Sequence, residues 1–221
     1  MNGLRSLVVV GALSAARWAV AGEQVYEPLS AAVRSALHGS VADRASPKLV
    51  FATPHEAQKW LSSMSARLAK RIPDAQTRVE FLTTVQYEAK RAGLDPQMVL
   101  GLIEVESGFR KYAVSRAGAR GYMQVMPFWV NLIGEADHDL FKLRINLRYG
   151  CVILRHYLDA EQGDIHRALS RYNGSPGNDA YAVKVVRSWQ SRWLFQGQRR
   201  AAGSSSRISG GADREPMRRQ T

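Results

Sequence analysis

The sequence is poor in cysteine, in acidic residues and in long apolar runs. Cys151 is the single cysteine among 221 residues, which excludes an intramolecular disulfide framework and a zinc site built from several cysteines. The apolar runs are too short for a set of membrane-spanning helices, so a polytopic membrane protein is excluded. Hydrophobic residues nevertheless make up 45% of the chain, more than a disordered protein would contain, and we therefore expect a folded core.

The first 21 residues have the pattern of a secretory signal peptide. Arg5 provides the positive start, residues 7–16 form a short apolar stretch, and Ala-Val-Ala at 19–21 is the small-x-small pattern at which signal peptidase cleaves. The alternative is a buried N-terminal helix, because Arg17 within the stretch weakens the signal-peptide pattern. We favour the signal peptide, since a stretch interrupted at Arg17 is too short to span a bilayer. Because no cysteine lies near the predicted cut, we expect a periplasmic or secreted protein with neither a lipid anchor nor a transmembrane anchor.

Basic residues outnumber acidic ones. Without residues 1–21, the remaining 200 residues hold 29 Lys and Arg against 19 Asp and Glu, a net charge of +10. This charge suits an anionic polymer: nucleic acid, anionic lipid or the peptides of a cell-wall glycan. Export and the absence of zinc-finger spacing argue against nucleic acid, so we expect no nucleic-acid partner.

Apolar residues recur at helical spacing through most of the chain. The pattern predicts helices over about 54–72, 74–91, 96–107, 145–158, 164–172 and 181–195. Asp95-Pro96 is a good helix start, because Asp caps a helix and Pro suits its first turn. Since no run of alternating strand residues appears, we predict a mainly α domain over residues 55–196.

The flanks of this domain differ in composition from it. We expect residues 22–54 to be loosely structured, with one short helix around 30–37. Residues 197–221 contain six arginines, Gly and Ser runs and almost no large apolar side chain, so they cannot offset their ordering entropy, and we predict a disordered basic tail. The tail either docks to an anionic surface or simply improves solubility.

Glu106 is the strongest candidate for a catalytic residue. On a helix, its neighbours on the same face are the apolar residues at positions 99, 102 and 103, whereas Glu104 points to the other side. Burial disfavours the charged form of a carboxyl group and raises its pKa, and a general acid must hold its proton near neutral pH. The alternative is a glutamate at a helix end that local hydrogen bonds satisfy.

The residues after Glu106 follow a recognisable order. They are Ser107-Gly108-Phe109, Ala113, Ser115, Gly118-Ala119, Gly121 and Met123-Gln124-Val125-Met126-Pro127, then Asn146, Gly150, Tyr157-Leu158 and Arg-Tyr-Asn-Gly-Ser-Pro-Gly at 171–177. This order resembles the soluble lytic transglycosylases, relatives of goose-type lysozyme, over about residues 82–189. One motif departs from the family, which commonly has Ala-Tyr-Asn-Ala-Gly-Pro where this chain has Arg171-Tyr-Asn-Gly-Ser. We expect this to alter the shape of a subsite more than the chemistry.

The matched side chains suit a sugar polymer. Gln124 offers a donor and an acceptor for sugar hydroxyl and N-acetyl groups, and Ser115 offers a small hydroxyl. Met123 and Met126 offer soft apolar surface for a ring face, and Tyr172 has a hydroxyl group to steady Glu106 or the substrate. We predict the substrate-binding residues to be Ser115, Gln124, Met126, Tyr172 and Asn173, and the supporting residues to be Ser107, Gly118, Gly121, Met123, Asn146 and Tyr181.

The resemblance implies a lysozyme-like domain with one catalytic acid, which falls on Glu106. Most glycosidases use two carboxylates, and the matched motifs contain no second one: Glu104 faces away, and Asp137, Asp139 and Asp179 lie in predicted loops. One carboxylate is enough if the substrate itself supplies the group that takes the place of the second carboxylate. We therefore predict an exported peptidoglycan lytic transglycosylase that cleaves the β-1,4 bond between N-acetylmuramic acid and N-acetylglucosamine and leaves 1,6-anhydromuramoyl ends. The five histidines lack metal-ligand spacing, and we expect neither a metal nor a cofactor.

Two other functions remain open. A muramidase-type hydrolase of the same fold would use water in place of the internal attack. A glycan-binding or wall-opening accessory protein would serve a secretion or conjugation apparatus, and an active enzyme is compatible with that role. Peptidoglycan strands are thus the expected partner, an envelope machine is a further candidate, and we expect a monomer.

Overall fold

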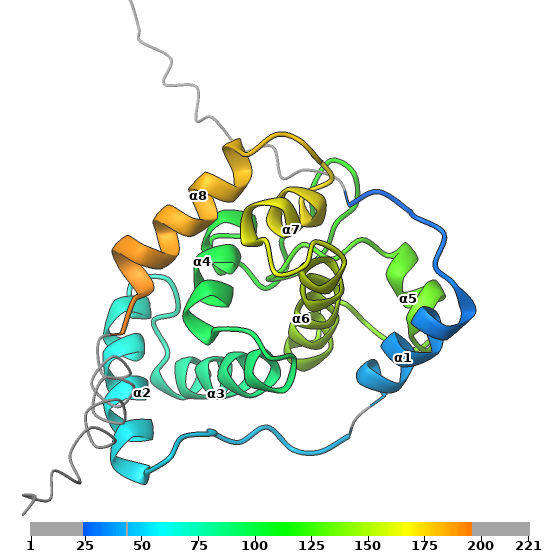
Figure 1. The fold of residues 1–221 in the computed structure, drawn as a ribbon. Coiled ribbons are helices and arrows are strands. Elements are labelled where there is room, and N and C mark those ends of the chain that lie inside the picture. The colour runs from blue at the N-terminus through cyan, green and yellow to red at the C-terminus, as the bar shows by residue number, and fades with distance from the viewer. Residues whose placement is uncertain (1–23, 43, 196–221) are drawn as a thin grey trace, which may run out of the picture.

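The chain is seen in a computed structural model that describes residues 24–42 and 44–195. The predicted signal peptide and the predicted basic tail lie outside these residues. The described part contains α1 (Ala31–Val41), α2 (Pro54–Leu68), α3 (Ala75–Arg91), α4 (Pro96–Glu106), α5 (Phe128–Ile133), α6 (Leu143–Ala160), α7 (Ile165–Tyr172) and α8 (Ala180–Ser188), which continues into a π-helix, Trp189–Trp193 (Figure 1). The prediction of a mainly α fold is therefore confirmed.

Local sequence explains most of the helix starts. Thr53, Asp74, Asp95 and Asp164 each accept a hydrogen bond from a backbone N–H of the first turn of α2, α3, α4 and α7, respectively, which satisfies a group that the helix leaves unpaired. α5 lacks such a cap and falls in a stretch for which the sequence predicted only a connection. Among the described helices, none is both long and apolar enough to cross a membrane.

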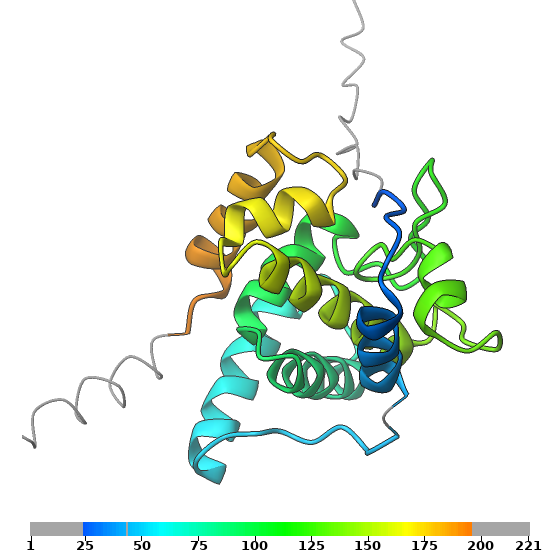
Figure 2. The same cartoon turned by 45° about the vertical axis from the view of Figure 1, so that its right-hand side comes forward.

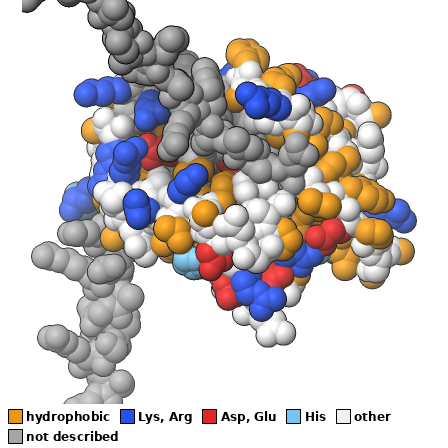
Figure 3. Space-filling view, turned by 90° about the horizontal axis from the view of Figure 1, so that it is seen from above, with side chains coloured by type: hydrophobic (Ala, Val, Ile, Leu, Met, Phe, Trp, Pro, Cys, Tyr) orange, Lys and Arg blue, Asp and Glu red, His pale blue; other side chains and the backbone are white. Residues whose placement is uncertain are grey.

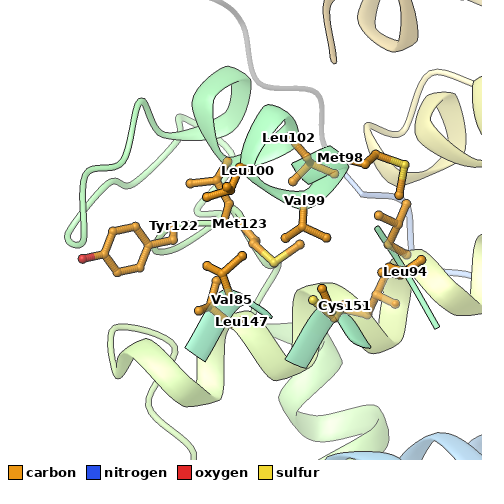
Figure 4. Packing of buried hydrophobic residues seen from close by; sticks show 14 of the residues in the cluster. Val85, Leu94, Met98, Val99, Leu100, Leu102, Tyr122, Met123, Leu147 and Cys151 are labelled. Carbon is orange, nitrogen blue, oxygen red and sulfur yellow. The ribbon is translucent and has the colours of Figure 1, made fainter. Parts of the chain in front are cut away.

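The core lies where α3, α4 and α6 meet. Figure 4 shows Val85 of α3 and Leu147 and Cys151 of α6 facing Val99 of α4, all of them fully or almost fully buried. α8 covers the opposite side of α4 and approaches it closely at Gly101, where an added Cβ would lie 2.9 Å from the backbone nitrogen of Trp189. Because α4 is enclosed on both sides, a side chain at its end has a fixed position.

The described residues before α2 are held more closely than the sequence led us to expect. α1 packs against α5 and α6, and Figure 2 shows it beside them. Glu88, completely buried on α3, pairs with Arg91 and Arg148. These arginines in turn donate to backbone oxygens at the end of α1, Arg91 to Ser40 at 2.7 Å and Arg148 to Val41 at 3.1 Å. The partners lie 51 and 107 residues apart in the sequence, so no local pattern could reveal this anchor.

Candidate active site

Glu106 is the last residue of α4 and is buried. The helix ends there because Gly108 and Phe109 take positive φ angles of 58° and 66°, which turn the chain away. Glu106 as a whole residue is 9% exposed, and the hydroxyl group of Tyr181 on α8 donates a hydrogen bond to its Oε1. The expected burial of Glu106 is thus found, and its direct partner comes from a helix 75 residues further along the chain.

Burial determines the protonation of this carboxyl group. It raises the pKa of Glu106 from 4.5 to about 8, and the hydrogen bond from Tyr181 opposes that rise only in part. About nine-tenths of the molecules therefore carry a protonated Glu106 at pH 7. Glu106 can donate a proton at neutral pH, as a general acid must.

Glu104 lies on the other face of α4, as predicted, and is a structural residue. Its carboxylate accepts hydrogen bonds from Ser188 Oγ at 2.7 Å and Trp193 Nε1 at 3.0 Å, and it forms an ion pair with Arg192. Burial alone would raise the pKa of Glu104, but the bonds from Ser188, Trp193 and Arg192 outweigh it and lower the pKa. Glu104 stays ionised and ties α4 to the end of α8.

Gln124 lies in the loop between α4 and α5 and is buried. Its Nε2 donates to the backbone oxygens of Ala113, at 3.1 Å, and Gly121, at 2.8 Å. Its own backbone has a φ of 48°, which only a tightly constrained turn imposes on a residue other than glycine. Because both amide hydrogens are used within the loop, Oε1 is the atom left to meet a ligand, whereas the sequence suggested a donor as well.

Asn146 holds the same loop from α6. Its Oδ1 accepts from the backbone N–H of Met123 at 2.8 Å, and its Nδ2 donates to the backbone oxygens of Arg120 at 2.8 Å and Leu140 at 2.9 Å. Gly121 makes this clamp possible, because its φ is 75° and an added Cβ would lie 2.6 Å from the Leu140 oxygen. Asn146 and Gly121 therefore hold the backbone of the Gln124 loop in place.

The two methionines of the motif have different environments. Met123 is completely buried beneath the loop, among core residues such as Val99 and Leu102 (Figure 4), so it cannot provide surface for a sugar ring. It fits there because Gly150 of α6 has no side chain, and a Cβ at that position would lie 2.7 Å from Met123 Cβ. Met126 is only partly buried and keeps the predicted position at the surface.

Tyr172 does not bond to Glu106, the alternative that the sequence offered. It is buried, and its hydroxyl group donates to the backbone oxygen of Met123 at 2.7 Å. The next residue, Asn173, is nearly buried and donates to Ser175 Oγ at 2.9 Å. Tyr172 therefore braces the Gln124 loop.

The remaining predicted residues shape the backbone around the site. Ser115 Oγ accepts from the backbone N–H of Ala119 at 3.0 Å and closes a turn in which Gly118 has a φ of 91°. Ser107, buried directly after Glu106, donates to the Ile103 oxygen at 3.2 Å. Ser115 stays partly exposed and is open to a ligand, whereas Ser107 is not.

Glu135, Asp137 and His138 form a cluster after α5 that the sequence spacing did not reveal. Their potential metal-ligand atoms lie within 4.8 Å of one another. The hollow beside them is lined by Arg44 and Arg144, among other residues. These positive charges oppose a bound cation, and we assign no role to the cluster.

The fold and the site are those of a helical, lysozyme-like domain with a buried acid at the end of a central helix. The sequence model of the Transglycosylase SLT domain family matches residues 83–194, just over half of the chain. The chain belongs to this family.

Several curated relatives share part of the sequence. "Membrane-bound lytic murein transglycosylase C" of Actinobacillus pleuropneumoniae serotype 5b (strain L20) is 52% identical over 48 residues, 22% of this chain and 13% of the relative. The protein of the same name in Mannheimia succiniciproducens is 38% identical over 65 residues, 29% of this chain and 16% of the relative. "Transglycosylase" of Enterobacteria phage PRD1 is 28% identical over 107 residues, 48% of this chain and 39% of the relative. The matches thus span well under half of each relative.

Proposed function

We propose that this protein is a peptidoglycan lytic transglycosylase in which Glu106 acts first as acid and then as base. The observation that carries the proposal is that Glu106 is buried at the end of α4, where its Oε1 accepts a hydrogen bond from the hydroxyl group of Tyr181. This burial raises the pKa of Glu106 to about 8, so the group can hold a proton at neutral pH. The influences on its pKa are burial and the Tyr181 bond, with no neighbouring carboxylate among them. That environment suits a mechanism with a single acid.

In the first step, Glu106 donates its proton to the glycosidic oxygen between N-acetylmuramic acid and N-acetylglucosamine. The bond from C1 to that oxygen breaks, and the leaving sugar departs as an alcohol. The oxygen of the muramoyl residue's own acetamido group stabilises the positive charge at C1, which is the task of the second carboxylate in most glycosidases. Glu106 is left as a carboxylate in an apolar environment that favours the return of a proton.

In the second step, the Glu106 carboxylate takes the proton from the C6 hydroxyl of the same muramoyl residue. O6 attacks C1 and displaces the acetamido oxygen, which gives a 1,6-anhydro ring. The acid is restored, and no water is consumed. Tyr181 keeps its hydrogen bond to Glu106 Oε1 in both steps and thereby stabilises the transient carboxylate.

The proposed sugar-binding wall consists of Ser115, Gln124 Oε1, Met126 and Asn173. The hydrogen bond between Asn146 and the Met123 backbone supports a structural role for these two residues. We assign the same role to Tyr172, because its hydroxyl group donates its hydrogen bond to the Met123 oxygen. The turn that carries Ser115 and Gln124 is fixed before any ligand binds, which lowers the entropic cost of binding.

We further propose that the first 21 residues direct export and that the protein meets peptidoglycan in the bacterial periplasm as a monomer. Lys and Arg side chains are spread over the face shown in Figure 3 and are densest at its left, which suits a wall whose peptides carry carboxylates. An envelope machine that recruits the enzyme is compatible with this function.

A single substitution tests the role of Glu106. Glu106→Gln preserves the shape and the acceptor for Tyr181 but removes the titrating proton, and should abolish release of soluble fragments from purified peptidoglycan while binding to the sacculi persists. Glu80→Gln is the matched control, since Glu80 is exposed on α3, and it should remain active. Fragment release by the Glu106→Gln variant at the wild-type rate would refute the mechanism.

A further inference from the structure

The first described residues, 24–27, contact the candidate active site, although the sequence offered no role for them. Figure 2 shows this segment descending beside α7 toward α1. Tyr26 packs edge to face on Phe128, the first residue of α5, with ring centroids 5.7 Å apart. Gln24, in contrast to its neighbour Val25, is only 4% exposed.

Gln24 bridges two parts of the proposed sugar-binding wall. Its Oε1 accepts the backbone N–H of Met126 at 3.2 Å. Its side chain also lies close enough to the hydroxyl group of Tyr172 to influence that group's pKa, and this hydroxyl group donates to the Met123 oxygen. One side chain therefore joins both ends of the 123–126 turn to α7.

Glu27 anchors the other end of the segment. It forms an ion pair with Arg171 of α7. Arg171 also pairs with Glu161 at 3.2 Å and lies over the ring of Tyr157, 5.2 Å from its centroid. The guanidinium group is thus held on three sides, so Glu27 meets a fixed partner. Arg171 therefore fastens the segment that carries Gln24.

We propose that residues 24–27 form a strap that holds one end of the proposed sugar-binding wall, and that Gln24 and Glu27 are positioning residues for sugar binding. Gln24 holds the Met126 backbone and the Tyr172 hydroxyl where the substrate needs them, and Glu27 holds Gln24 in place through Arg171. The proposal rests on the proposed function, since it assigns the wall to a muramoyl-containing glycan. The functional domain then includes residues before position 54.

The strap acts on binding and leaves the proton transfer at Glu106 unchanged. Without Gln24, the Met126 N–H loses its acceptor and the 123–126 turn relaxes. The contacts between the sugar-binding wall and the glycan, which are made equally in the ground and transition states, then weaken. Loss of such contacts raises KM and leaves kcat nearly constant. A purely structural role would lower the melting temperature without this selective change in KM.

The test compares Gln24→Met, which removes the hydrogen bond to the Met126 backbone and the amide beside Tyr172 at similar volume, with Gln58→Met, which alters an exposed glutamine on α2. With a soluble muropeptide oligomer as substrate, we expect Gln24→Met to raise KM about tenfold, the factor that corresponds to roughly 1.4 kcal/mol, with kcat within about twofold. Gln58→Met should change neither constant.

Glu27→Gln extends the test, because Glu27 is partly exposed and its loss should leave the fold intact. We expect Glu27→Gln to raise KM about threefold. When Glu27→Gln is combined with Gln24→Met, the further rise in KM above that of Gln24→Met alone should be less than threefold, since one strap is released only once. Fully additive effects, or an unchanged KM in Gln24→Met, would overturn the proposal.

A binding measurement separates this proposal from the proposed function. The dissociation constant of the same oligomer is measured by calorimetry for Glu106→Gln with and without Gln24→Met. If the wild type shows no turnover, the proposed function fails, yet about tenfold weaker binding in the double variant still supports the strap. Equal binding by the two chains, or none by either, refutes the strap.

Discussion

Replacing Glu106 by glutamine should stabilise the fold, and the gain should grow with pH. The pKa of Glu106 is about 8 in the folded protein against an ordinary value of 4.5. Below about pH 4.5 both the folded and the unfolded states are protonated, and burial of this group costs no ionisation energy. Between pH 4.5 and 8 only the unfolded state loses its proton, so stability falls as pH rises, by about 1.4 kcal/mol per pH unit.

The resulting cost to the wild type is roughly 3 kcal/mol at pH 7 and larger above pH 8, where the folded protein must ionise a buried group. Glutamine does not titrate, and its side-chain oxygen still accepts the hydrogen bond from Tyr181. The variant therefore escapes this cost without losing a contact. A gain in stability at the expense of activity is typical of catalytic groups held in unfavourable environments.

Denaturant unfolding at about pH 5, 7 and 8.5 measures the effect. The free energy of unfolding of Glu106→Gln should exceed that of the wild type by about 1 kcal/mol at pH 5, roughly 3 kcal/mol at pH 7 and between about 4 and 5 kcal/mol at pH 8.5, with the same denaturant dependence. Glu80→Gln should show no such trend. An advantage that is constant across pH, or a variant less stable than the wild type at pH 8.5, would show that Glu106 is not held protonated by burial.

Four further results are expected. Because protonated Glu106 starts the reaction, kcat/KM should fall as pH rises through about 8, and a profile flat to pH 9.5 would contradict this. Tyr181→Phe removes a hydrogen bond that lowers the pKa of Glu106, so the fall in kcat/KM should move to higher pH while kcat falls about tenfold. A move of this fall to lower pH would show that the hydrogen bond from Tyr181 does not lower the pKa of Glu106. Gly121→Ala should lower the free energy of unfolding by roughly 2 kcal/mol or more in denaturant titrations, because it adds strain at a positive φ and crowds Asn146. Glu88→Gln should cost roughly 3 kcal/mol in the same assay, since Arg91, Arg148 and also Arg144, 3.5 Å from Glu88 Oε1, lose their buried anionic partner; a neutral effect would show that they find other acceptors.

Periodicity and capping residues predicted the main helices, because each depends on residues only a few positions apart. Asp95 and the apolar face of α4 placed Glu106 at the end of a buried stripe, and the structure has it there. α5 escaped prediction because it has six residues and no side-chain cap. A helix that short forms mainly through tertiary packing, which a local pattern cannot reveal.

The side-chain partners within the site were less predictable. The sequence offered Tyr172 as the partner of Glu106 and gave Tyr181 only a supporting role, whereas the packing of α8 on α4 brings Tyr181 to Glu106. Met123 and Met126 look alike in the sequence, yet the absent side chain of Gly150 draws Met123 into the core. These outcomes depend on contacts between distant elements.

Mass spectrometry of the fragments released from purified peptidoglycan tests the central claim most directly. The account predicts muropeptides with 1,6-anhydromuramoyl ends from the wild type and none from Glu106→Gln. Fragments heavier by one water, with reducing ends, would contradict it and show that the enzyme is a hydrolase.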